Sequence, residues 1–196
     1  MRTLATALVV AFLLVAFGLR SLLQWRRTGR TGFVGLREGA GGLERAAGVL
    51  LAAVLLLGPL APWVGSPLWA RGHAIGAGLA VLGIVATLVA QLQMGDSWRI
   101  GVDASERTAL VTTGLYSKVR NPIFTAMLLC SIGLALAAPT ALALTLPPLL
   151  LLALEVQVRR VEEPHLLRVH GEDYRAWAER TGRFLPGIGR LGRGSE

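Results

Sequence analysis

The chain has 196 residues, 53% of them hydrophobic and 16% charged, with a formal net charge of +8. This length fits one domain, and the scarcity of charge indicates a membrane protein. The single cysteine, Cys130, lies in an apolar stretch and excludes a disulfide framework, and the three histidines are poorly spaced for a ligand set. We therefore expect no metal site.

Four stretches without Asp, Glu, Lys or Arg follow one another along the chain. A helix needs about 20 apolar residues to cross the hydrocarbon layer. The first three stretches fit one span each, and we expect Arg20 to snorkel at the end of the first. The stretches are 3–19, 46–70, 72–95 and 121–154.

The glycines of the third stretch have two interpretations, a nucleotide-binding loop or helix packing. A glycine-rich nucleotide loop needs a preceding strand, and no strand is expected here. Small residues about four apart let membrane helices approach closely. We therefore expect packing from Gly72, Gly76, Gly78 and Gly83.

The fourth stretch is too long for one comfortable span and only just long enough for two short ones. Pro139 and Thr140 break it near the middle, and Pro147-Pro148 is expected to interrupt its second half. A tight hairpin here gives an all-α bundle of about five transmembrane helices. It also brings the segments 118–124 and 155–166 to the same membrane face, so two distant polar clusters can form one site.

The positive charges lie in the first loop, the third loop and the C-terminal segment, whereas the second loop holds only Arg71. The positive-inside rule then places the N-terminus outside and the C-terminus in the cytosol of a cell inner or plasma membrane. The same rule accounts for the net charge, so no nucleic-acid partner is expected. The partners expected are membrane lipids and a lipophilic substrate.

After the hairpin, residues 165–180 are expected to form an amphipathic helix on the cytosolic interface, with Leu166, Val169, Tyr174 and Trp177 on one face. We treat 1–196 as one membrane domain. It comprises three N-terminal spans (1–93), a second half that carries the polar clusters (94–186) and a loose tail (187–196).

Three short segments could carry chemistry, and each also has a structural explanation. G-L-Y-S-K-V-R-N-P-I-F (114–124) ends in a helix start whose free N–H groups can bind a ligand, or it is a basic membrane anchor. Glu162 and Glu163 either complement a helix dipole or bind a cation or ligand donors. Trp98 and Arg99 either anchor the third span or meet an acidic, lipid-like substrate.

The segment 114–124, followed by E-E-P-H-L-L and a closing R-F-L-P, resembles the isoprenylcysteine carboxyl methyltransferase family and the wider phospholipid methyltransferases. The resemblance covers about 94–186, and the order and spacing of its motifs are more specific than any one of them. It implies a methyltransferase that binds S-adenosylmethionine at the cytosolic mouth of the hairpin and methylates a lipophilic acceptor, a carboxylate or a lipid headgroup.

The resemblance also implies roles for individual residues. Arg120 and Glu163 would be catalytic, and Arg120 would also orient the acceptor. Trp98 and Arg99 are the other predicted substrate-binding residues, because of their interfacial position. The cofactor would lie between two walls, formed by Tyr116, Val119, Asn121 and Pro122 on one side and by Glu162, Glu163 and Leu166 on the other.

Two positions depart from the family pattern, since Asn121 replaces the usual His and Phe124 the usual Tyr. Asn cannot act as a general base near neutral pH, and this leaves the acceptor open. Two alternatives therefore remain: a membrane NADPH-dependent reductase that resembles sterol reductases, and a lipid-binding protein without catalysis.

Overall fold

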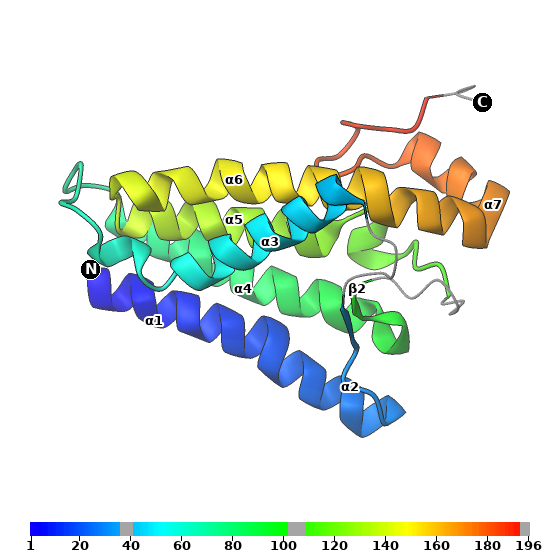
Figure 1. The fold of residues 1–196 in the computed structure, drawn as a ribbon, viewed down its shortest axis with the longest axis horizontal. Helices are drawn as coiled ribbons and strands as arrows, with labels where there is room; N and C mark the ends of the chain where they lie inside the picture. The colour runs from blue at the N-terminus through cyan, green and yellow to red at the C-terminus, as the bar shows by residue number, and fades with distance from the viewer. Residues whose placement is uncertain (36–40, 102–108, 193–196) are drawn as a thin grey trace.

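The structure is a computed structural model that describes residues 1–35, 41–101 and 109–192. Its long elements are all helices, and most of them run lengthwise along the molecule (Figure 1). The first helix comprises α1 (Arg2–Leu13), a π-helical segment (Leu14–Leu19) and α2 (Arg20–Thr28). The predicted all-α membrane fold is confirmed.

The remaining long elements are α3 (Gly42–Leu57), α4 (His73–Gln93), α5 (Pro122–Ala137), α6 (Ala141–Gln157) and α7 (Glu163–Arg180). A π-helical turn, Val158–Glu162, joins α6 to α7. The shorter elements are the 3-10 turns Ala61–Trp63, Gly95–Ser97 and Gly114–Ser117, and the strands β1 (Phe33–Gly35) and β2 (Ile100–Gly101). The two strands pair in parallel and form a small two-stranded sheet between the first and third loops.

Among the described residues, three helices are long and apolar enough to cross a membrane: Arg2–Thr28, His73–Gln93 and the continuous helix Ala141–Arg180. Helix α5 is apolar but shorter. Helix α3 has 16 residues, and at 1.5 Å per residue it is about 24 Å long, less than the hydrocarbon thickness of about 30 Å. The protein is an integral membrane protein, and the count of five spans stays a prediction.

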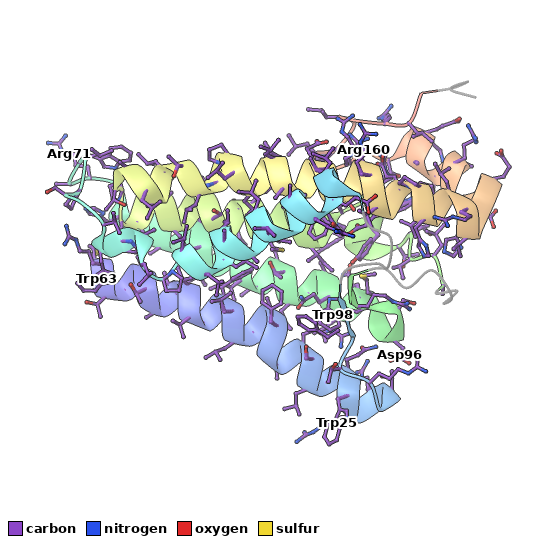
Figure 2. All side chains as sticks on the ribbon, in the orientation of Figure 1. Trp25, Trp63, Arg71, Asp96, Trp98 and Arg160 are labelled. Atoms are coloured by element: carbon purple, nitrogen blue, oxygen red, sulfur yellow. The ribbon has the colours of Figure 1, made fainter. Side chains whose placement is uncertain are left out.

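The two ends of the bundle carry different side chains. Trp63 and Arg71 lie at one end, and Trp25, Trp98 and Arg160 lie toward the other (Figure 2). Tryptophans at both ends suit the two membrane–water interfaces. The polar C-terminal elements and α7 gather at the end with Arg160, and this end holds the candidate site.

The predicted hairpin is present. Helix α5 ends at Ala137, and Thr140 caps α6 by accepting a 3.1 Å hydrogen bond from the N–H of Ala143. The Thr140 hydroxyl also donates to the carbonyl of Ala61, at 2.7 Å, which ties the hairpin to the loop after α3. The predicted interruption at Pro147-Pro148 is wrong, since α6 continues through both prolines. Packed membrane helices tolerate interior prolines because their neighbours satisfy the freed carbonyls.

Helices α4 and α5 pack closely through small residues. A Cβ added to Gly76, Gly83 or Gly133 would lie less than 3.0 Å from atoms of the facing helix. Only glycine therefore permits this close approach of the two helices. The predicted packing role of Gly76 and Gly83 is confirmed. A Cβ added to Gly72 or Gly78 would meet no atom within 4 Å, so these two glycines are not required for this packing.

Arg20 does not snorkel as predicted. Its side chain is 1% exposed, and its guanidinium donates a 2.6 Å hydrogen bond to the carbonyl of Gly95. The helix continues eight residues past it, to Thr28, and so Arg20 lies inside the packed stripe of the first helix rather than at its end.

The predicted amphipathic helix begins earlier than expected and is not continuous. It starts at Glu163, and Gly171 adopts non-helical angles (φ 52°, ψ −125°) that divide α7 into two parts. Only glycine adopts this conformation readily. Tyr174 and Trp177 are buried in a cluster with Tyr116, so this part of the apolar face packs on the protein itself.

Candidate active site

The entrance of α5 is held by the segment that follows α7. Val119 pairs with Gly182 in an isolated parallel bridge. The N–H of Arg120 donates to the carbonyl of Gly182 at 2.8 Å, and the N–H of Asn121 donates to the carbonyl of Arg183 at 3.1 Å. These bonds fix the backbone on both sides of Arg120 and direct its side chain toward α7.

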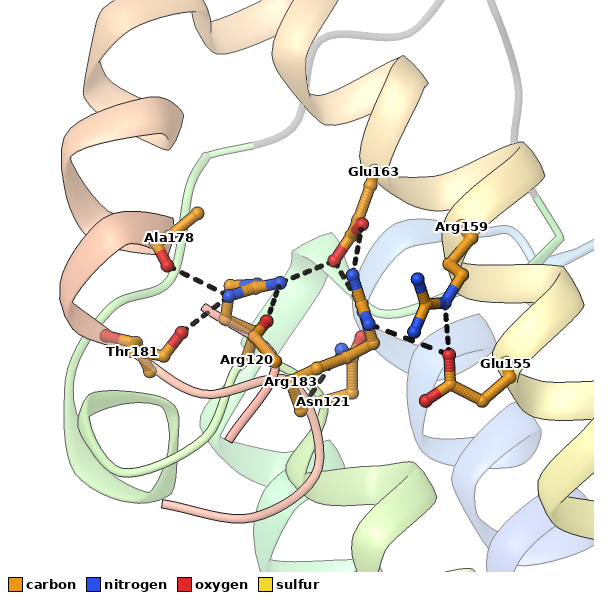
Figure 3. Close-up of polar contacts among 9 residues, drawn as sticks. Arg120, Asn121, Glu155, Arg159, Glu163, Ala178, Thr181 and Arg183 are labelled. Carbon is orange, nitrogen blue, oxygen red and sulfur yellow. Dashed lines mark hydrogen bonds and ion pairs between the residues drawn. The ribbon is translucent and has the colours of Figure 1, made fainter. Parts of the chain in front are cut away.

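The Arg120 guanidinium is buried, with the whole residue 4% exposed, and it donates hydrogen bonds to four acceptors. One is a carboxylate oxygen of Glu163, at 2.6 Å (Figure 3). The others are the carbonyls of Ala178 at 3.0 Å, Thr181 at 2.5 Å and Gly189 at 3.0 Å. Arg120 thus joins the start of α5 to both ends of α7 and to the segment beyond it.

Glu163 is shared between two arginines. Arg183 donates from Nε to Oε1 at 2.9 Å and from Nη2 to Oε2 at 3.0 Å, a bidentate contact, while Arg120 bonds Oε1. Burial opposes ionisation of Glu163, but hydrogen bonds and charge from Arg183 and Arg120 outweigh it and lower the pKa of this carboxyl. Glu163 is therefore ionised, and both of its carboxylate oxygens accept hydrogen bonds from buried arginines.

The ion-pair network extends to α6. Arg183 also lies 3.6 Å from Oε2 of Glu155, and the same oxygen accepts a 2.5 Å hydrogen bond from Arg159 (Figure 3). Three arginines and two glutamates alternate here, and so most of the buried charge is compensated locally.

The surroundings of Glu162 shift its pKa in the direction opposite to that of Glu163. Burial raises the pKa of Glu162 to about 7, with the charge of Glu163 adding to this and a hydrogen bond with Gln157 opposing it. Successive helical residues point about 100° apart, so Glu162 and Glu163 point in different directions. Its charge acts instead on Tyr116 and Tyr174, whose pKa values are raised, chiefly by their own burial.

An aromatic cluster adjoins Glu162. Tyr116, Tyr174 and Trp177 pack together with Leu166 at the edge, and the rings of Tyr174 and Trp177 meet edge-to-face at 5.6 Å. The hydroxyl of Tyr116 donates to the carbonyl of Ala90 at 3.2 Å. Three atoms in this region are buried without a hydrogen-bond partner: Nε of Arg120, Nε2 of His170 and Nε1 of Trp177.

The structure thus brings together most of the predicted site residues from both walls. Val119 and Pro122 are buried at the start of α5. Asn121 also donates from its side-chain amide to the carbonyl of Arg183, at 3.2 Å. Tyr116, Glu162 and Leu166 share the aromatic side of the site, and Arg120 and Glu163 share its charged side.

Trp98, which was predicted with Arg99 to bind substrate, contacts the first helix instead. Trp98 is 3% exposed, and its ring lies 4.5 Å from the guanidinium carbon of Arg20. Arg99 is half-buried beside it in the chain. Trp98 therefore packs on Arg20, a residue that was not predicted to belong to the site.

Arg183 and the segment after it were not predicted to belong to the site. Arg183 belongs to the closing R-F-L-P motif, and this motif was the available signal. The predicted loose tail does not fit residues 187–192, because Gly189 accepts from Arg120, Ile188 accepts from Arg183 and the N–H of Leu191 donates to Ala178. Residues 193–196 lie outside the described part of the chain.

An apolar cavity lies deeper in the bundle, between α1, α3, α5 and α6. Phe12, Val54 and Met127 are among its lining residues, and Ser131 supplies a hydroxyl. It does not include the Arg120–Glu163 network. Among the described residues, no group of three or more His, Cys, Asp or Glu is placed to hold a metal ion.

Residues 72–173 match the family model described as phospholipid methyltransferase. The chain belongs to the phospholipid methyltransferase family. The match covers half of the sequence and includes α4, the hairpin and both glutamates, whereas Tyr174, Trp177 and Arg183 lie beyond its end. No curated protein sequence matches the chain significantly.

The fold is similar to that of a solved eukaryotic intramembrane Ras methyltransferase, isoprenylcysteine carboxyl methyltransferase, with a TM-score of 0.53 and 22% sequence identity. The similarity covers 76% of this chain and 53% of that protein. The chain therefore spans about half the length of the solved structure that it matches. This likeness supports the predicted membrane fold.

Proposed function

We propose that this protein methylates a lipophilic acceptor with S-adenosylmethionine at the membrane face where Arg120 and Glu163 meet. Membership of the phospholipid methyltransferase family supports this reaction class. The observation that carries the proposal is the 2.6 Å contact between these two residues, which come from the two ends of the α5–α6 hairpin. It joins the two motifs that resemble the cofactor-binding elements of the family.

The residues on the aromatic side of this site fit the chemical groups of the proposed cofactor. When bound, S-adenosylmethionine supplies a methyl group on a positively charged sulfur. The faces of Tyr116, Tyr174 and Trp177 can attract a cation or stack on an adenine, and the carboxyl of Glu162 can stabilise a nearby positive charge. The partnerless Nε1 of Trp177 and Nε2 of His170 can pair with polar groups of a ligand.

The ion pairs among Arg120, Glu163 and Arg183 hold the site in place. Their charges are paired with one another and are not free to bind a ligand. Their hydrogen bonds hold α5, α7 and the segment after α7 together. A rigid, desolvated surrounding suits methyl transfer, because alignment of the two reacting atoms supplies much of the rate. We propose that Arg120 acts chiefly through this network, with its partnerless Nε as the atom left for a ligand.

The acceptor is either a carboxylate or a headgroup amine. A carboxylate needs no base, whereas an ammonium group must lose a proton before it can accept a methyl group. Asn121 cannot remove that proton. Glu162 can, since its pKa of about 7 keeps it partly ionised near neutral pH.

We further propose that this face is cytosolic, with the N-terminus on the other side. The arginines of the first loop, the third loop and the C-terminal segment support this orientation through the positive-inside rule. Cysteine labelling of single exposed positions with a membrane-impermeant reagent tests it: a cysteine at Arg71 should react from outside, and one at Lys118 should not.

Binding of S-adenosylhomocysteine and NADPH to the purified full chain in detergent distinguishes the proposed methyltransferase from a reductase and from a non-catalytic lipid-binding protein. Saturable binding of S-adenosylhomocysteine without NADPH binding supports a methyltransferase. The reverse result supports a reductase, and binding of neither supports a lipid-binding protein without catalysis.

A further inference from the structure

A second buried polar cluster lies between the first helix and the C-terminal end of α4. Arg20, Gln24 and Gln91 are 1%, 4% and 3% exposed. Their side chains donate hydrogen bonds across the helix interface, each to a backbone carbonyl. Arg20 bonds Gly95 at 2.6 Å, Gln24 bonds Asp96 at 2.9 Å and Gln91 bonds Ala16 at 2.9 Å.

These three bonds leave part of each side chain without a partner. The Nε of Arg20 and the Oε1 atoms of Gln24 and Gln91 are buried and make no hydrogen bond. None of the described carboxylates lies within ion-pair distance of Arg20. The Trp98 ring, 4.5 Å from the guanidinium carbon, and the charge of Asp96 act on Arg20 without forming an ion pair. The cluster therefore presents one buried cation without an ion-pair partner and two amide oxygens without a donor, an arrangement that favours the binding of a further polar group.

The backbone is distorted at the same place. The carbonyl of Ala16, which accepts from Gln91, belongs to the π-helical segment Leu14–Leu19. Such π-helical turns frequently occur at functional sites, where they redirect side chains. Here the turn immediately precedes Arg20, and a second π-helical turn precedes Glu163 in the candidate active site.

Tyr116 connects the two clusters. The charges of Arg20 and Glu162 both act on its phenol, lowering and raising its pKa respectively, while burial raises it most. The Tyr116 hydroxyl donates to the carbonyl of Ala90, the residue before Gln91, at 3.2 Å, and its ring packs with Tyr174 and Trp177 on the proposed cofactor side. A ligand held at Arg20 would be a neighbour of the site where methyl transfer is proposed.

The buried face of the first helix that carries Arg20 and Gln24 becomes apolar toward the N-terminus. Its buried positions are spaced three or four residues apart and comprise Ala5, Val9, Phe12, Ala16, Arg20 and Gln24. Val9, Phe12 and Leu13 line the apolar cavity. At 1.5 Å per residue, Phe12 is about 12 Å along the helix from Arg20. One face of the helix thus offers a polar end and an apolar end.

We propose that Arg20, Gln24 and Gln91 bind the headgroup of an amphiphile, a headgroup that combines an anion with a hydrogen-bond donor. Arg20 pairs with the anion, and the two amide oxygens accept from the donor. The hydrocarbon chain follows the first helix toward Phe12. Resting on the proposed function, we assign this ligand as the methyl acceptor.

The binding of simple amphiphiles to the purified full chain, in an uncharged maltoside detergent at pH 6, tests the headgroup chemistry. Dodecyl phosphate carries an anion and, as its monoanion, a hydroxyl donor. Dodecanoate is an anion without a donor, dodecanol is uncharged, and inorganic phosphate has no chain. We expect dodecyl phosphate to bind at least about tenfold tighter than dodecanol, with dodecanoate between them and inorganic phosphate weakest. Equal affinity for dodecyl phosphate and dodecanol would overturn the inference, as would equal affinity for inorganic phosphate.

Variants locate the site. Arg20→Gln should reduce dodecyl phosphate affinity to the dodecanol level, whereas the exposed Arg71→Gln should leave it unchanged. Gln24→Leu or Gln91→Leu should narrow the preference for dodecyl phosphate over dodecanoate. If Arg20→Gln does not fold, the affinities of the unaltered chain for dodecyl phosphate, dodecanol and inorganic phosphate still test the inference.

S-adenosylhomocysteine binding, measured on the same samples, separates this inference from the proposed function. Cofactor binding without any preference for dodecyl phosphate would overturn the headgroup site and leave the methyltransferase proposal intact. A preference for dodecyl phosphate without cofactor binding would support the headgroup site and overturn its assignment to a methyl acceptor.

Discussion

Arg120 and Glu163, separated by the whole α5–α6 hairpin, share a buried 2.6 Å hydrogen bond at one end of the bundle. Glu163 also binds Arg183 through both carboxylate oxygens. One carboxylate therefore pairs with two buried guanidinium groups from different segments, and Glu155 lies 3.6 Å from the second of them, Arg183. The arrangement makes Glu163 the residue on which the assembly of the site depends most.

Glu163→Gln should strongly destabilise the protein, because it leaves Arg120 and Arg183 buried without their shared counter-charge. Breaking a buried ion pair from one side typically costs about 3–5 kcal/mol. The matched control is Glu172→Gln, whose side chain is 85% exposed and pairs with Arg175 at 3.3 Å. Thermal unfolding in detergent should show a large loss for the first variant and almost none for the second; similar curves would contradict the shared-carboxylate account.

Arg120→Lys keeps the positive charge but removes the planar group that reaches four acceptors in different directions. A lysine ammonium has three donors on a flexible stem and cannot reproduce this geometry. We expect weaker S-adenosylhomocysteine binding and a lower unfolding temperature. Lys118→Arg, at an exposed position two residues earlier, should change neither property. If Arg120→Lys matched the unaltered protein in both measurements, charge alone would explain the role of this residue.

Glu162 should make stability depend on pH in the direction opposite to Glu163. The pKa of Glu162 is raised to about 7 in the folded protein. Its contribution to stability is therefore fully present below the ordinary carboxyl pKa and is lost as the pH rises through 7. Glu162→Gln should flatten the change in unfolding temperature between pH 5 and pH 8, whereas Glu179→Gln, at a half-buried position in the last turn of α7, should leave that change in place.

The hairpin and its meeting point could be predicted from the sequence because Pro139 and Thr140 interrupt an uncharged stretch and the charge distribution requires the chain to return. The family motifs then identified which side chains would meet. The continuity of α6 through Pro147-Pro148 could not be predicted, since it depends on neighbouring helices rather than on local preference.

Arg183 and Arg20 show why the rest of the site was missed. Arg183 belongs to the closing R-F-L-P motif, but only tertiary hydrogen bonds bring it to Glu163, and the residues that follow, 187–196, were predicted to form a loose tail. Arg20 lies at the boundary of an apolar stretch, where a snorkelling arginine is the usual outcome. Its spacing of four residues from Gln24 was visible in the sequence, but the facing position of Gln91 requires the packed structure.

Gly133→Ala should destabilise the α4–α5 contact, because the added methyl group would collide with the backbone of Ala80. Overpacking of this kind typically costs about 1–3 kcal/mol. Gly78→Ala places the same methyl group on α4 where no atom lies within 4 Å, and it should be neutral or slightly stabilising. Unfolding temperatures of the two variants test this difference, and equal losses would contradict glycine-mediated packing.

The central claim is tested most directly by methyl transfer from S-adenosylmethionine with a labelled methyl group, using the purified full chain and lipids extracted from the host membrane. We predict that label enters the lipid-soluble fraction with the unaltered protein, and that a Trp177→Leu variant, which loses an aromatic face and the partnerless Nε1, transfers at least about tenfold less. Folded protein that binds no S-adenosylhomocysteine and labels no lipid-soluble molecule would contradict the account.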